Sequence, residues 1–103
     1  MDLTKEEKQI LTLLNDTPVK DFLDYAQGYI NLKRGNIKRI VDKFLNWRFI
    51  EILKLKNKND LWYFHTDKVK EDMIDTSLDY RLKFGSNPPI LNAHEKLEKK
   101  IKN

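Results

Sequence analysis

The sequence predicts a small α+β domain, mostly helical, in which three helices precede a β-hairpin and further helices follow it. Apolar residues recur at helical spacing before the hairpin and again after it. Between them, two short runs rich in branched and aromatic residues flank a polar turn, which is typical of a hairpin over residues 50–65. A chain of 103 residues has the size of one domain. We expect residues 1–66 to form its core unit and residues 67–103 a C-terminal helical extension.

The first three helices are predicted from caps and from apolar spacing. Thr4 can cap the first helix, and Glu7 completes a capping-box pattern three residues later. A second helix is expected to begin at Thr17-Pro18, a cap residue followed by a proline in the first turn. The helix over residues 33–47 has the clearest pattern, because one face is apolar and the other is cationic. Its apolar face comprises Ile37, Ile40, Val41, Phe44 and Leu45.

In the C-terminal extension, the sequence predicts a further long helix that is capped by Thr66-Asp67. A break at residues 85–89 and a final amphipathic helix are expected to follow. Two apolar stripes on the long helix exceed what a small core needs, which predicts a homodimer. The alternative is that the final helix buries both stripes within the same chain. The residues assigned to dimerisation are Val69, Met73, Ile74, Leu78, Leu82 and Phe84.

Charge is distributed unevenly along the chain. The whole chain carries a net charge of +4, but residues 31–58 hold nine lysines and arginines against two acids, a local net charge of +7. Residues 1–30 carry a net charge of −3. Such asymmetry indicates a polyanionic partner more strongly than the total does. An ordinary solvated helix face is the alternative explanation for the same cations.

Several other classes of function lack the residues they need. No stretch approaches the roughly 20 consecutive apolar residues of a membrane-spanning helix. The first residues show no signal-peptide pattern and the chain has no cysteine, so we expect a cytoplasmic, nucleoid-associated protein. His65 and His94 lack the spacing of metal ligands. We therefore expect no metal site, no cofactor, no catalytic residues and no enzymatic activity.

The order helix, helix, helix, hairpin, helix over residues 4 to about 80 resembles the winged helix-turn-helix family, in particular the small MarR-like and ArsR-like regulators. In that family a glycine usually precedes the first strand of the wing, and in this chain that position falls near Arg48. The likeness to a recognition helix running into a wing lies within residues 19–56, in Leu32, Ile37, Ile40-Val41, Phe44-Leu45 and Phe49-Ile50.

The resemblance implies a homodimeric transcriptional regulator that binds double-stranded DNA in a sequence-specific manner. It places the helix over residues 33–47 in the major groove and the tip of the 50–65 hairpin on the flanking backbone. The residue chemistry agrees, because lysine and arginine neutralise phosphates while arginine and asparagine can read base edges, here Arg34, Asn36 and Arg39. The predicted DNA-binding residues are Lys33, Arg34, Asn36, Lys38, Arg39, Lys43, Lys54, Lys56 and Lys58.

Three alternatives remain open at this point. A winged-helix subunit of a replication or transcription assembly would present an exposed apolar patch rather than a continuous positive strip. The same basic face could bind RNA. Trp62, Tyr63 and Phe64 could form a stacking platform for single-stranded nucleic acid, although alternation along a strand favours core packing for at least two of them.

Overall fold

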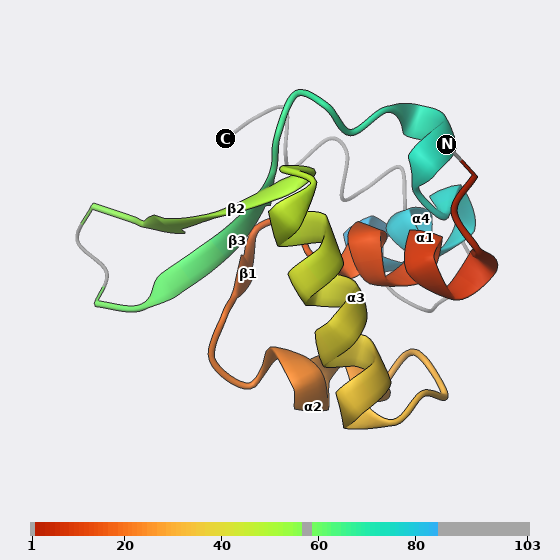
Figure 1. The fold of residues 1–103 in the computed structure, drawn as a ribbon, viewed down its shortest axis with the longest axis horizontal. Helices are drawn as coiled ribbons and strands as arrows, with labels where there is room; N and C mark the ends of the chain where they lie inside the picture. The colour runs from red at the N-terminus through yellow and green to blue at the C-terminus, as the bar shows by residue number, and fades with distance from the viewer. Residues whose placement is uncertain (1, 57–58, 85–103) are drawn as a thin grey trace.

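The computed structural model describes residues 2–56 and 59–84, and Figure 1 shows how their helices and strands are arranged. Over these residues the chain forms an α+β fold with four α-helices and a three-stranded antiparallel sheet, so the α+β part of the fold prediction is confirmed. In chain order the elements are α1 (Lys5–Leu13), β1 (Thr17–Pro18), α2 (Phe22–Gln27), α3 (Arg34–Asn46), β2 (Ile50–Lys54), β3 (Leu61–His65), the 3-10 turn η1 (Glu71–Met73) and α4 (Thr76–Phe84).

Helix α1 begins with the capping box that its sequence predicts. The Thr4 hydroxyl accepts a hydrogen bond from the Glu7 N–H at 3.1 Å, and the Glu7 carboxylate accepts one from the Thr4 N–H at 2.8 Å. Two of the N–H groups that a helix start leaves without partners are thereby satisfied. The cap also places the Glu7 side chain on the side of α1 that faces α3.

Helices α1 and α2 both pack against α3, and α4 packs against α1 (Figure 1). The apolar face of α3 contributes Ile37, Val41 and Phe44 to the core, as its spacing predicts. None of the helices in residues 2–56 and 59–84 is long and apolar enough to cross a membrane. The remaining core residues are Ile10, Leu11, Leu13, Leu14, Phe22, Ala26, Ile30, Phe49, Ile50, Tyr63 and Leu78.

The sheet has the order β1-β3-β2, so β3 is its central strand. Thr17 and Pro18 form the edge strand β1 opposite Tyr63 and Trp62, and the prediction that they begin a helix was wrong. The flanking N–H groups of Asp16 and Val19 donate to β3 carbonyls at 2.9 Å, so the missing proline N–H costs no hydrogen bond here. Helix α2 begins four residues later than Pro18, after Asp21 turns the chain in a left-handed conformation (φ 62°).

The segment after the hairpin also differs from its prediction, because no long helix begins at Thr66. The Thr66 hydroxyl donates to the Arg48 carbonyl at 2.6 Å, and the Thr66 N–H donates to the Phe49 carbonyl at 3.0 Å. These bonds hold the chain beside the end of α3, and η1 precedes the short helix α4. The Asp75 carboxylate begins α4 by accepting the Leu78 N–H at 3.0 Å.

The residues assigned to dimerisation lie mostly against the chain's own core. Leu78 belongs to the core, and Phe84 lies beside Tyr80 with the ring centroids 4.7 Å apart. This packing accounts for much of the apolar surface from which a dimer was predicted. The final helix predicted after residue 89 lies outside the described residues. The assigned residues that are partly buried against the core are Val69, Met73, Ile74 and Leu82.

Helix α3 ends in a tight turn in which Arg48 adopts a left-handed backbone conformation, with φ of 61°. The Arg48 N–H donates to the Leu45 carbonyl at 3.1 Å, and the Phe49 N–H donates to the Phe44 carbonyl at 2.9 Å. This pair of bonds is the Schellman motif, whose left-handed position is usually a glycine. It is also the position at which the family resemblance leads us to expect a glycine.

Replacing Arg48 by glycine is expected to raise the free energy of unfolding by up to about 1 kcal/mol. A left-handed L-residue costs roughly 1–2 kcal/mol, and the greater chain entropy of glycine offsets about 0.5–1 kcal/mol of that gain. Urea denaturation measures the change. Arg48→Ala is the control, because it removes the same charge and keeps the Cβ. A glycine variant less stable than the alanine variant would contradict this account of the turn.

Candidate functional site

Four residues of α3 form an exposed ridge on the side opposite its core face. They follow one another at spacings of four, three and four residues, which places them along one side of a helix. Of the four, only Arg39 was assigned to a site from the sequence. The helical spacing that predicts the core face also predicts which residues lie half a turn away from it, and that would have identified the other three. We call this surface the α3 ridge, and it consists of Gly35, Arg39, Asp42 and Asn46.

Gly35 makes the beginning of the ridge a patch of bare backbone. A Cβ built on this residue would meet nothing within 4 Å outside its own helix and chain neighbours, so packing does not require a glycine. Its φ lies in the ordinary helical range as well. Within a helix, glycine is typically less stable than alanine by about 0.5–1 kcal/mol. The fold therefore offers no reason for this glycine, whereas close approach of another molecule to the backbone would provide one.

Two of the predicted cations on α3 form exposed ion pairs. The Lys38 ammonium donates to the Asp42 carboxylate at 2.9 Å, and Arg34 pairs with Asp24 of α2. The hydrogen bond and the negative charge of Asp42 raise the pKa of Lys38. Because exposed pairs of this kind contribute little to stability, both cations can exchange a carboxylate for a phosphate at small cost.

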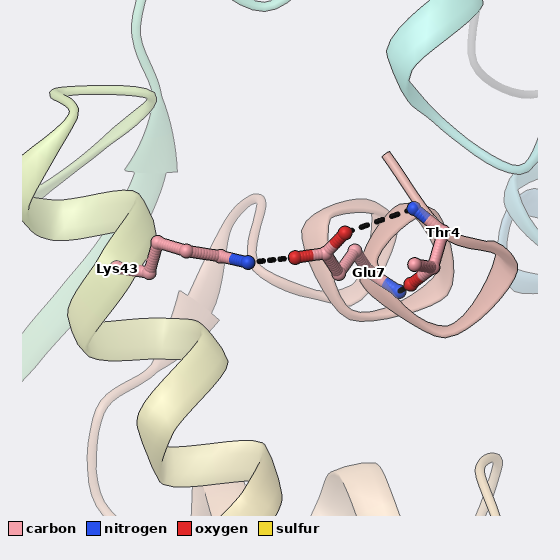
Figure 2. A network of polar contacts seen from close by, with 3 residues as sticks. All are labelled: Thr4, Glu7 and Lys43. Carbon is pink, nitrogen blue, oxygen red and sulfur yellow. Dashed lines mark hydrogen bonds and ion pairs between the residues drawn. The ribbon is translucent and has the colours of Figure 1, made fainter. Parts of the chain in front are cut away.

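Lys43 differs from the other predicted cations in its surroundings. Figure 2 shows its ammonium group reaching from α3 to the carboxylate of Glu7 on α1, whose other oxygen accepts the Thr4 N–H. The Glu7 side chain is only 11% exposed and the Lys43 side chain 36%, so the carboxylate of this ion pair is largely shielded from water. The same ammonium lies 5.1 Å from the ring centroid of Trp47. Lys43 therefore joins α3 to α1, and we remove it from the candidate interface.

The other predicted residues lie at the surface around α3 and the hairpin. Lys58 falls outside the described residues. Arg48, an exposed cation directly after α3, was not assigned from the sequence, because the charge pattern marks a segment rather than single side chains. Around α3 and the hairpin, the exposed cations that form no ion pair within residues 2–56 and 59–84 are Lys33, Arg39, Arg48, Lys54 and Lys56, and Asn36 is exposed as well.

Strands β2 and β3 project away from the helices, as Figure 1 shows. The side chains in the outer half of this hairpin are accordingly exposed although they are apolar, with Leu53 at 42% and Leu61 at 46%. Lys54 and Lys56 lie on the same projecting arm. The hairpin can therefore reach a partner that also contacts the helical part of the molecule.

The aromatic residues of β3 are divided between the two faces of the sheet. Tyr63 is buried against Phe22, with the ring centroids 5.4 Å apart, and burial raises the pKa of its hydroxyl. Trp62 and Phe64 point to the other face and are half-buried. The expectation that at least two of the three belong to the core was wrong, because only Tyr63 does.

His65 is held in one tautomer by the backbone of α1. Its Nε2 lies 2.6 Å from the Leu11 carbonyl oxygen, and because a carbonyl can only accept, Nε2 carries the hydrogen. Burial lowers the pKa of His65, and the Leu11 carbonyl and Asp79 oppose this effect. Within residues 2–56 and 59–84, no group of three or more histidines or carboxylates lies close enough to hold a metal ion.

The free energy of unfolding is expected to fall as the pH is lowered below about 6.5. In the folded chain the pKa of His65 lies below the ordinary histidine value of 6.5, so the unfolded chain binds the proton first. The loss continues until the pH passes the folded pKa of this histidine. Urea denaturation between pH 7.5 and 5 measures the effect, above the range in which exposed carboxylates titrate. His65→Gln should remove most of the dependence of the free energy of unfolding on pH over this range. His94→Gln measures how much of that dependence comes from the other histidine. An unchanged profile in His65→Gln would contradict the assignment.

Comparisons of the chain with protein-family models, with curated proteins and with solved structures found no match.

Proposed function

We propose that this chain is a winged helix-turn-helix protein that binds double-stranded DNA in a sequence-specific manner and acts as a transcriptional regulator. In this proposal α3 enters the major groove, and the β2–β3 hairpin is the wing that contacts the flanking backbone. The α3 ridge is the observation that carries the proposal. It is an exposed helix face that no other element of the described chain covers, with a bare backbone patch and a cation at its centre.

The dimensions of α3 suit a major groove. Its 13 residues correspond to a length of about 20 Å, and a groove about 12 Å wide admits an α-helix. The ridge also carries side chains of the kinds that distinguish bases. Arginine pairs with guanine, asparagine with adenine, and a carboxylate accepts from cytosine. Arg39, Asn46 and Asp42 respectively supply these groups.

The remaining exposed cations suit the phosphate backbone. Lys33 and Arg34 lie at the start of α3, where the positive end of the helix dipole also favours an anion. Lys54 and Lys56 lie on the wing. Contacts of this kind position a protein on the duplex without reading its sequence. The predicted homodimer is not needed for this proposal, because most of the residues assigned to it pack on the chain's own core.

Binding to a duplex is expected to weaken steeply with salt. If five or six cations meet phosphates, log K should fall with log salt at a slope of about −5. Fluorescence-anisotropy titrations of a labelled random-sequence duplex at several salt concentrations measure the slope. Lys54→Ala and Lys56→Ala should each make the slope less steep by about one unit. Lys5→Ala, on the exposed start of α1, is the matched control that should leave it unchanged.

Absence of duplex binding at low salt would overturn the DNA proposal. A specific observation would then favour a second function, a winged-helix subunit that docks a protein of a replication or transcription assembly. The observation is the exposed apolar surface of the hairpin, to which Ile52, Leu53 and Leu61 contribute. In that case, substitutions of these three residues rather than of the cations would weaken binding to the partner.

A further inference from the structure

A hollow with a volume of about 470 Å³ lies where β1, the beginning of α2 and β3 meet. Pockets of 300–1,000 Å³ are typical of small-molecule sites. Pro18 and Trp62, which are opposite each other in the sheet, contribute to its walls. Phe22 and Tyr25 of α2 contribute two more rings, with centroids 6.2 Å apart. Phe22 is buried, whereas Tyr25 is 38% exposed, so part of this aromatic wall is open to solvent.

Charged side chains surround these aromatic walls. Asp16, Lys20 and Asp21 all line the hollow and are exposed. Neither aspartate forms a side-chain hydrogen bond or ion pair within residues 2–56 and 59–84, and Asp21 occupies the N-cap position of α2 without capping it. The hydroxyl oxygen of Thr17, which also lines the hollow, is buried and has no hydrogen-bond partner there. The site thus has two unpaired carboxylates and an unused hydroxyl.

We propose that this hollow binds a small organic cation. The faces of aromatic rings attract a cation, and carboxylates nearby add a Coulombic attraction. A neutral apolar ligand would cover the two carboxylates without replacing the water that solvates them, which is unfavourable. An anion would meet two negative charges against the single positive charge of Lys20. This binding is separate from the proposed DNA binding and does not depend on it.

The test is an NMR titration of the full-length chain with benzyltrimethylammonium, in which backbone amide shifts are followed. Phenylacetate, which carries the same ring and the opposite charge, is titrated in parallel at equal ionic strength. The cation is expected to shift the amides of residues 16–25 and 61–63 in a saturable manner, and phenylacetate is not. Equal shifts with both compounds, or no saturable shift with the cation, would overturn the proposal.

Charge variants test the same site with opposite signs. Asp16→Asn and Asp21→Asn are each expected to weaken binding of the cation about two- to five-fold, the range for exposed charges. Asparagine also tolerates the left-handed conformation that both residues adopt, with φ of 57° and 62°, so the backbone is preserved. Lys20→Gln is expected to strengthen binding by a similar factor. Asp67→Asn, an exposed aspartate that does not line the hollow, is the control. Unchanged affinity in the Asp16→Asn/Asp21→Asn double variant would reject the assigned carboxylates.

Discussion

A Gly35→Ala protein is expected to unfold less readily and to bind duplex DNA at least about fivefold more weakly. The new methyl group meets nothing in the folded chain, and alanine is the better helix former, so stability should rise by about 0.5 kcal/mol. In the proposed complex the same methyl group lies between the α3 backbone and the groove. Overpacking of a fitted contact typically costs about 1–3 kcal/mol, and tenfold corresponds to about 1.4 kcal/mol.

The opposite signs of these two effects make the experiment specific. A substitution that merely damages the fold lowers both stability and binding, whereas this one should separate them. Urea denaturation and duplex titration of the same samples measure the two quantities. Ser77→Ala is the matched control, because Ser77 is an exposed residue in the first turn of α4. It should leave duplex affinity unchanged. A Gly35→Ala protein that binds DNA as well as the wild type would place the interface away from the α3 ridge.

The parts of the fold that local sequence determines were predictable. The Thr4–Glu7 capping box and the apolar spacing of α3 each depend on residues within a few positions of one another, and both are found in the structure. The β2–β3 hairpin joins strands that are close in the chain, so its pairing is also nearly local. In each of these cases the tertiary environment agrees with the local preference.

The two errors arise where distant partners decide between local alternatives. Thr17-Pro18 suits both the first turn of a helix and an edge strand, and its pairing with Tyr63 and Trp62 selects the strand. Thr66 can cap a helix, but its hydroxyl instead donates to the carbonyl of Arg48, 18 residues earlier. Neither partner is visible in the neighbouring sequence.

The candidate site was predictable as a segment but not residue by residue. Charge and helical spacing locate the cationic face of α3, yet they do not show which cations have partners elsewhere. Lys43 illustrates this, because Glu7 lies 36 residues away on α1. Gly35 and Asn46 were missed for another reason, since a charge pattern does not mark uncharged residues of the α3 ridge. Only the removal of Lys43 from the candidate interface depends on the packing of α1 against α3.

Replacing Lys43 by methionine is expected to lower the free energy of unfolding by about 1–3 kcal/mol and to leave duplex affinity unchanged. The substitution leaves the largely buried Glu7 carboxylate without its cation, and an unpaired buried acceptor costs that much or more. It also removes the ammonium beside the Trp47 ring, while methionine preserves most of the side-chain volume. Urea denaturation at pH 7 measures the loss. The Glu7→Gln/Lys43→Met double variant should recover part of it, because a neutral amide keeps the bond to the Thr4 N–H without an unpaired charge.

Lys38→Met is the control that separates stability from binding. Lys38 lies on the same helix, but its pair with Asp42 is exposed, so no measurable loss of stability is expected. Its ammonium group is available to a phosphate, and the salt dependence of duplex binding should fall by about one unit. Substitution of Lys43 is therefore expected to change mainly stability, and substitution of Lys38 mainly duplex binding. If Lys43→Met weakened duplex binding as much as Lys38→Met in protein that is fully folded, Lys43 would belong to the interface and its contact with Glu7 would not be its main role.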